Sequence, residues 1–176
     1  LGPTTLRKWF LLALVAALQL PAAGPGFAEE YLNVDRGIAI TPPAGWVRVQ
    51  DPFALAHFVK DPALGVPGLA VALELFPDGP PARDSAEYGR NILAGLERIG
   101  GITVVERARP VRINKQKGSK FIFERTVTKA GQQPSVVRHE LYHFLRGTRV
   151  ISVIVRAERE AFAELERQLE KQKALL

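Results

Sequence analysis

Hydrophobic residues alternate with small or polar residues along several short stretches of the chain, which is the period typical of β-strands. The clearest stretch is 69–75, where large aliphatic residues alternate with Ala70, Ala72 and Glu74. Residues 150–155 are apolar apart from Ser152, as is typical of a strand near the centre of a sheet. Further strands are predicted at residues 31–40, 46–49, 57–60, 102–113, 120–128 and 135–145.

Proline and glycine interrupt this pattern at positions that predict turns. Pro42 and Pro43 lack backbone donors and have a fixed φ, so the chain is expected to turn there. Arg146–Arg149 is predicted to be a tight hairpin turn, because Gly147 suits its first central position. Pro110 predicts a bulge or an edge position within its strand, since proline cannot donate to a sheet ladder.

Two stretches repeat their apolar residues at helical spacing instead. Asp84 and Glu87 have the pattern of a capping box and predict a helix start, and Gly100-Gly101 predicts the end of that helix. Its apolar stripe is predicted to comprise Tyr88, Ile92, Leu96 and Ile99. A second amphipathic helix is predicted over residues 158–175, with an apolar side formed by Phe162, Leu165 and Leu169.

Neither helix can bury its apolar stripe alone, so both are expected to pack against the sheet. The predicted fold class is therefore α+β, with an antiparallel sheet of about six to eight strands layered between helices as an α-β-α sandwich. Residues 29–176 are short enough to form a single domain.

The first 28 residues have the three-part pattern of a secretory signal peptide. Arg7 and Lys8 precede an apolar run from Trp9 to Leu20, and small, helix-breaking residues follow. Cleavage is predicted after Ala28, with cleavage after Ala23 as the alternative. A membrane anchor is the less favoured interpretation, because the run is shorter than the ~20 residues that cross a bilayer. The mature chain is thus predicted to be exported, and to be periplasmic or extracellular.

Composition narrows the classes of function. The 176-residue chain contains no cysteine, which excludes disulfides and thiolate metal sites. It has 24 basic and 18 acidic residues, and residues 1–28 hold two of the basic ones, so cleavage lowers the net charge from +6 to +4. This mild charge permits attraction to anionic surfaces but does not indicate nucleic acid as a partner.

The segment Gly37-Ile38-Ala39-Ile40-Thr41-Pro42-Pro43-Ala44-Gly45-Trp46 resembles the opening of PsbP-like domains, in which an apolar strand leads into a proline-glycine-tryptophan turn. A helix start at Asp84, Gly118 before an aromatic strand, the apolar strand at Val150 and a closing helix with Phe162 agree with this family. The resemblance implies an α-β-α sandwich without a shared enzymatic activity or catalytic residues. Its members include an extrinsic photosystem II subunit, a nuclear Ran-binding protein and exported bacterial proteins, so it implies no single task.

The segment His139-Glu140-Leu141-Tyr142-His143 matches H-E-x-x-H, in which two imidazoles hold zinc and the glutamate activates water. That chemistry needs a helix, where residues four apart lie about 6 Å apart along the axis. On a strand the two histidines would share a face about 13 Å apart, too far to share one ion. Short turns on both sides favour a strand, with two surface or half-buried histidines and no metal. A small secreted zinc hydrolase, with Glu140 as its base, is the alternative.

Six basic residues and no acidic one occur between positions 107 and 120. This segment is a candidate contact surface for anionic lipid, cell-wall polyanion or an acidic partner. The other interpretation is a solvated edge of the sheet, whose charges discourage pairing with another strand. The six residues are Arg107, Arg109, Arg112, Lys115, Lys117 and Lys120.

Other chemically capable residues carry weaker signals. Trp46 is interpreted as an anchor that packs the opening turn against the sheet, with an exposed ligand contact as the alternative. His57 has no partner that the sequence identifies. The sequence contains neither a nucleophile elbow nor a glycine-rich phosphate loop, and no cofactor is expected.

These patterns together predict an exported, non-enzymatic accessory or binding domain. Its partner is expected to be another protein or an envelope component, not nucleic acid, with at most peripheral membrane contact. The two alternatives are the zinc hydrolase and an anionic-surface binder that acts through residues 107–120.

Overall fold

The structure is a computed structural model that describes residues 31–33, 36, 38–62, 67–113, 115–128, 131 and 133–173, without the side chains of 169–173. The predicted signal peptide and its alternative cleavage sites lie outside the described residues. Within the described part of the chain, no helix is long and apolar enough to span a membrane.

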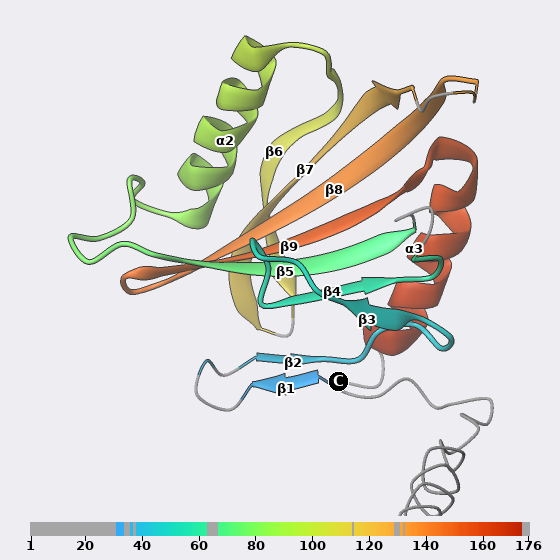
Figure 1. Ribbon diagram of the computed structural model, residues 1–176. Coiled ribbons are helices and arrows are strands. Elements are labelled where there is room, and N and C mark those ends of the chain that lie inside the picture. Colours follow the sequence, from blue (N-terminus) through green and yellow to red (C-terminus); the bar gives the residue numbers. More distant parts are fainter. Residues whose placement is uncertain are drawn as a thin grey trace, which may run out of the picture.

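The main sheet consists of two antiparallel meanders that meet at its centre (Figure 1). The first meander comprises β3 (Val47–Val49), β4 (Ala56–Val59) and β5 (Gly68–Leu75). Helix α2 (Ser85–Ile99) then leads to the second meander of β6 (Thr103–Ile113), β7 (Gln116–Val127), β8 (Ser135–Arg146) and β9 (Arg149–Glu158), which α3 (Arg159–Lys173) follows. The described strands are ordered β3-β4-β5-β9-β8-β7-β6, and each pairs antiparallel with its neighbours. The prediction of an α+β fold with an antiparallel sheet is confirmed.

Strand β9 lies at the centre of this sheet, between β5 and β8. Its apolar residues explain the position, because Val150, Ile151 and Val155 are all buried. The prediction of a central strand here is confirmed. The strand continues to Glu158, three residues beyond the predicted apolar run, and pairs with Val137 of β8 at that point.

The opening segment differs from its prediction as one strand over residues 31–40. It forms a hairpin of two short strands, β1 (Tyr31–Asn33) and β2 (Ile38–Ile40), which make a separate two-stranded sheet. Ile38 packs against Val71 and Ile151 of the main sheet. Residues 34–37 separate the two strands in the sequence. The apolar stretches on either side are too short for the sequence alone to show that they are separate strands.

Strand β6 forms one edge of the main sheet, as Pro110 predicted. Its pairing with β7 shifts register twice, between Val104 and Glu106 and between Glu106 and Arg109. Pro110 follows directly after the second shift. Both the bulge and the edge position predicted from this proline are therefore present, and the first meander supplies the other edge through β3.

Helix α2 begins and ends at the predicted residues. The Asp84 carboxylate accepts a hydrogen bond from the Glu87 backbone N–H at 2.8 Å. The Glu87 carboxylate accepts from the Arg83 backbone N–H at 2.8 Å, one residue before the position that a capping box requires. Gly100 ends the helix with φ +82°, and its N–H donates to the Leu96 carbonyl at 3.1 Å.

The buried face of α2 contains three of the four residues of the predicted stripe, because Tyr88 is buried and Ile92 and Leu96 pack against the core. Leu93, which the stripe omitted, is 3% exposed and packs with Phe121 and Leu141. Ile99, which the stripe included, is 84% exposed, so that part of the prediction is wrong. At about 100° per residue Ile99 points to the same side of the helix as Tyr88, so its exposure comes from its position in the last turn.

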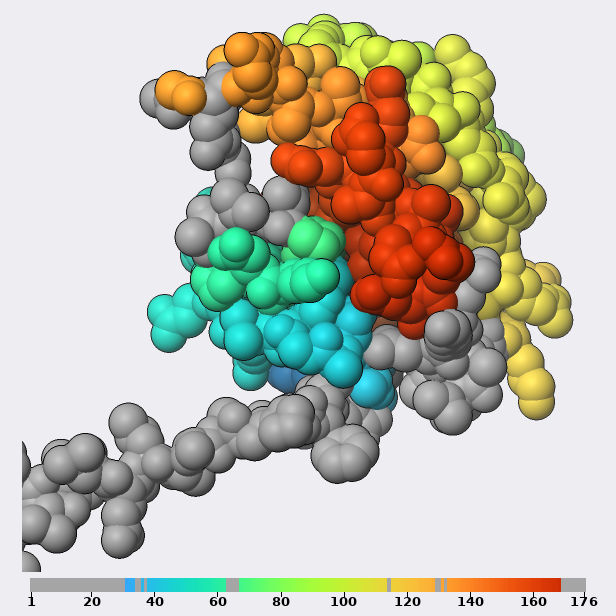
Figure 2. All heavy atoms as spheres, turned by 90° about the vertical axis from the view of Figure 1, so that its right-hand side faces the viewer, coloured from blue at the N-terminus to red at the C-terminus, as the bar shows by residue number. Residues whose placement is uncertain are grey.

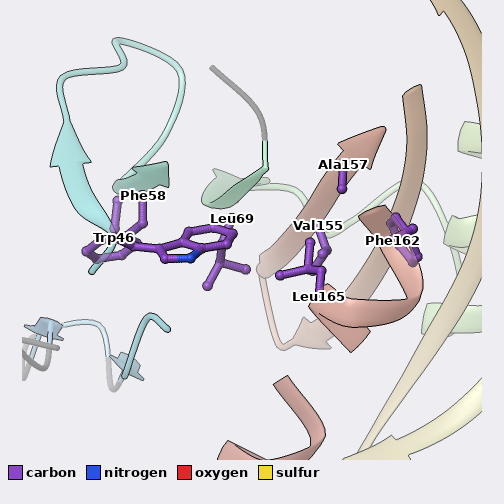
Figure 3. Packing of buried hydrophobic residues seen from close by; sticks show 8 residues of the cluster. Trp46, Phe58, Leu69, Val155, Ala157, Phe162 and Leu165 are labelled. Atoms are coloured by element: carbon purple, nitrogen blue, oxygen red, sulfur yellow. The ribbon is translucent and has the colours of Figure 1, made fainter. Parts of the chain in front are cut away.

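Helix α3 packs on a second apolar cluster (Figure 3). Phe162 and Leu165 contact a group of buried residues from the central strand and the first meander, namely Trp46, Ala56, Phe58, Leu69, Val155 and Ala157. Trp46 is only 8% exposed, which confirms its interpretation as a packing anchor. In Figure 2, α3 (red) lies across the middle of the molecular surface beside the β3–β4 segment (cyan).

The different burial of Leu93 and Ile99 predicts that truncating each side chain will change the free energy of unfolding by different amounts. Leu93→Ala should lower the free energy of unfolding by about 2–5 kcal/mol, because it removes buried methyl groups and leaves a cavity. Ile99→Ala should change it by less than about 0.5 kcal/mol, because that side chain is in water. Urea unfolding followed by circular dichroism measures both, and equal losses would contradict the assigned face.

Candidate functional site

The H-E-x-x-H segment lies in strand β8, which confirms its prediction as a strand. His139 pairs with Phe123 and Arg156, whereas His143 pairs with Ser119 and Ser152. The two histidines share a face but lie about 13 Å apart along the strand, so they cannot bind one zinc ion. In the described residues, no group of three or more His, Cys, Asp or Glu side chains is arranged to hold a metal ion. The zinc-hydrolase alternative therefore lacks its ligand geometry.

His143 is buried under helix α2, which corrects its prediction as a surface or half-buried residue. It is 3% exposed, its Nδ1 is hydrogen-bonded to Ser152 Oγ at 2.9 Å, and its Nε2 is buried without a partner. The Tyr88 ring of α2 makes an edge contact with it, with ring centroids 5.2 Å apart. Burial lowers the pKa of His143 to about 4, so the imidazole is neutral at physiological pH.

Glu140 points to the opposite face of the sheet from the two histidines. It is 3% exposed and accepts bonds from the Lys120 ammonium and the Tyr142 hydroxyl. Burial, followed by the hydrogen bond to Glu140, raises the pKa of Tyr142. The carboxylate that a zinc hydrolase would need as its base is instead the centre of a buried ion pair.

The basic segment divides into paired and unpaired residues. Arg107 forms an ion pair with Glu97 at 3.3 Å, Arg109 pairs with Glu106, and Lys120 pairs with Glu140. The sequence could not reveal the partners Glu97 and Glu140, because the fold brings them from α2 and β8.

The other three residues of this segment lie exposed at the β6–β7 turn, and we refer to Arg112, Lys115 and Lys117 as the basic hairpin end. Arg112 and Lys117 are direct partners across the two strands, and Lys115 occupies the turn with φ +65°. None of the three forms an ion pair with a described residue. Like charges placed opposite each other destabilise a sheet, so an anion bound here would relieve repulsion.

A second polar group was missed from the sequence, where His57 had no identifiable partner. His57 Nε2 lies 2.9 Å from Arg156 Nη2, and His57 Nδ1 lies 2.9 Å from Asp51 Oδ2. Because a guanidinium only donates, Nε2 accepts and the proton is on Nδ1. Burial and then Arg156 lower the pKa of His57, which keeps the ring neutral. Arg156 is 99 positions away, so no local pattern signals this contact.

An open groove of about 610 Å³ lies against residues 48–57 and has Asp51 and His57 in its lining. The Asp51 carboxylate also accepts from the Phe53 backbone N–H at 2.9 Å, which fixes the loop between β3 and β4. Phe53 itself is 88% exposed. The loop that borders the groove is thus fixed by the Asp51 carboxylate, which contacts both the His57 ring and the Phe53 backbone N–H.

Comparison with known proteins identifies the fold. No protein-family model and no curated protein matches the chain. The solution structure of cyanobacterial PsbP (CyanoP) from Synechocystis sp. PCC 6803 matches with a TM-score of 0.58 at 14% sequence identity, over 86% of this chain and 94% of that one. This chain has a PsbP-like fold. The PsbP-like resemblance inferred from the opening segment and the element order is therefore confirmed.

A second solved structure is similar over part of its length. It is a protein from Bacteroides thetaiotaomicron VPI-5482 at 12% identity, with a TM-score of 0.46 over 76% of this chain and 43% of that one. At 14% identity, the match to cyanobacterial PsbP shows only the fold. The roles of individual residues in the PsbP-like domain therefore rest on their own geometry.

Burial of His143 predicts a pH dependence of stability. Its pKa is about 4 in the folded domain and near 6.5 when unfolded, so the unfolded chain takes up a proton first as the pH falls. His143 should therefore lower the free energy of unfolding by roughly 3 kcal/mol between pH 6.5 and 4, at about 1.4 kcal/mol per pKa unit, and His139, whose pKa is also about 4, should add a similar decrease.

Urea unfolding of the PsbP-like domain at a series of pH values measures this slope. His143→Gln should reduce it by about half, because the amide does not titrate whereas His139, whose pKa is also about 4, still does. Ser152→Ala is the matched control, since it removes the hydrogen bond and keeps the imidazole. A slope that is unchanged in His143→Gln would show that this histidine does not cause the loss.

Proposed function

We propose that this PsbP-like domain is an exported, non-enzymatic accessory domain that binds an acidic partner through the basic hairpin end. The partner class is another protein or an envelope component, with only peripheral membrane contact. The observation that supports this most directly is the exposure of Arg112, Lys115 and Lys117 without ion-pair partners among the described residues. Export rests on the signal-peptide pattern of residues 1–28.

A non-catalytic role is supported by the fold and by the state of the candidate catalytic groups. The fold resembles that of cyanobacterial PsbP. Glu140 is held in an ion pair, and His143 is buried under α2. These contacts leave neither residue of the H-E-x-x-H segment free for the acid–base or metal chemistry that the motif would support.

We also infer that the domain has the α-β-α sandwich layering that the sequence predicted. Val155 of β9 packs with the α3 cluster, whereas Ile154 packs with the α2 cluster. Adjacent residues of a strand point to opposite faces, which supports one helix on each face. The basic hairpin end then extends from the sheet itself and is free of both helices.

The strength of the proposed contact follows from its charge. A lysine or arginine near an anionic surface contributes about 1 kcal/mol, and this attraction falls within a Debye length of roughly 8 Å at physiological ionic strength. Arg107 and Arg109 contribute less, because Glu97 and Glu106 already neutralise them. The three unpaired cations should therefore account for most of the salt-dependent affinity.

Neutralising the basic hairpin end tests the proposal. The triple variant Arg112→Gln, Lys115→Gln, Lys117→Gln should bind phosphatidylglycerol-containing vesicles or poly-glutamate, whichever the wild-type protein binds, about 100-fold more weakly. Vesicles represent an envelope lipid and poly-glutamate an acidic protein. Co-sedimentation and fluorescence anisotropy measure the affinities, and the wild-type affinity should fall steeply with added salt.

The matched control removes the same charge elsewhere on the surface. Lys60, Arg90 and Arg98 are exposed and form no ion pair with a described residue. Their simultaneous replacement by Gln should leave the affinity within a few-fold of wild type. If the control weakens binding as much as the hairpin triple, or if the wild-type protein binds neither probe, the proposed contact surface is wrong.

A further inference from the structure

Two arginines flank one histidine on three adjacent strands, away from the basic hairpin end. Arg125 lies on β7, His139 on β8 and Arg156 on β9. His139 is the direct partner of Arg156, and Arg125 is the partner of Val137, two residues before His139. All three side chains therefore lie on the same face of the sheet. Each arginine is a direct or diagonal neighbour of His139, at about 5 to 8 Å, and the Cα atoms of the two arginines are about 12 Å apart across two strands.

Neither arginine is neutralised by a carboxylate. Among the described residues, no acidic group lies within ion-pair distance of Arg125 or Arg156. Arg156 Nη2 donates to the neutral ring of His57, and its Nε is buried without a hydrogen-bond partner. An unpartnered buried donor on a permanent cation indicates a place where an ion or water completes the structure.

His139 lies between the two arginines in the sheet, and its neutral imidazole can donate one hydrogen bond to an anion. Its ring stacks on Phe123, with centroids 4.7 Å apart and an interplanar angle of 1°. Burial, then Arg156 and then Arg125 lower its pKa to about 4. On the other side of Arg156, the direct partner on β5 is Gly68, which has no side chain.

The carboxylates of this region lie at its margins. Asp51 is separated from Arg156 by His57, which it contacts at 2.9 Å. Glu158 is exposed on the same face as Arg156, opposite Val137, and forms no ion pair with a described residue. The cluster therefore holds two arginines without an ion-pair partner among the described residues, and Glu158 opposes their positive field only in part.

We infer that Arg125, His139 and Arg156 form a binding site for a small oxyanion, the phosphate or carboxylate group of a ligand. Planar guanidinium groups match both kinds of anion with paired N–H donors, and the imidazole supplies a third donor. A bound anion would offset the positive charge of both arginines, which the register places on either side of His139. The site lies about 26 Å along β7 from Lys117, so it is independent of the proposed function.

Titration of the protein with inorganic phosphate, followed by ¹H–¹⁵N NMR, tests the site. Phosphate should cause saturable shifts of the Arg125, His139 and Arg156 resonances and raise the pKa of His139. A parallel titration with acetate at equal ionic strength shows whether a carboxylate binds at the same place. The double variant Arg125→Gln, Arg156→Gln should raise the Kd at least about tenfold, since it removes both charge-assisted donors.

Four further variants test the assignment to these residues. Glu158→Gln should lower the Kd, because it removes the carboxylate two residues along β9 from Arg156. Arg90→Gln, Arg98→Gln has the same charge change as the double variant and should leave the Kd unchanged. The basic hairpin triple should also bind phosphate normally, which separates this site from the proposed partner surface. Arg125→Gln alone, at an exposed position, still reports on the site if the Arg156 variant fails to fold.

Two results would overturn the assignment. One is the absence of saturable shifts up to tens of millimolar of either anion. The other is a wild-type Kd in both Arg125→Gln and the double variant, which would place any bound anion elsewhere on the protein.

Discussion

The register between β8 and its two neighbours decides what the chemically capable residues of this domain can do. Because side chains alternate along a strand, Glu140 and the histidines of the same motif lie on opposite faces of the sheet. His143 then lies under α2, whereas Glu140 meets Lys120 across the β7–β8 pair. The same letters on a helix would converge on one metal ion. Here they stabilise two separate parts of the interior.

Local patterns in the sequence were sufficient for much of the fold. The central strand at Val150, the helix cap at Asp84 and the edge position at Pro110 each depend on neighbouring residues only. The burial of Ile99 and the single strand over 31–40 were wrong, because they depend on where an element ends relative to the sheet. The contact of His57 with Arg156 joins residues 99 positions apart, and only the completed register brings them together.

The candidate surfaces were predictable only in part, for the same reason. A run of basic residues is visible in the sequence, but the fold decides which of them are neutralised. Glu97 of α2 and Glu140 of β8 remove Arg107 and Lys120 from the unpaired set. The group at Arg125, His139 and Arg156 has no sequence signature, since its members come from three different strands. Strand pairing, more than the number of basic residues, thus decides which charges on this domain are neutralised and which stay unpaired.

The two rims of the sheet have a consequence for behaviour at high concentration. An open rim can act as a template on which a second molecule adds a strand and a filament grows. At one rim, β6 has two register shifts and a proline that cannot donate, so an incoming strand finds no continuous ladder. At the other, β3 is only three residues long. Both rims are therefore poor seeds for fibril growth, which is useful for a chain that contains no cysteine and so has no disulfide to stabilise it.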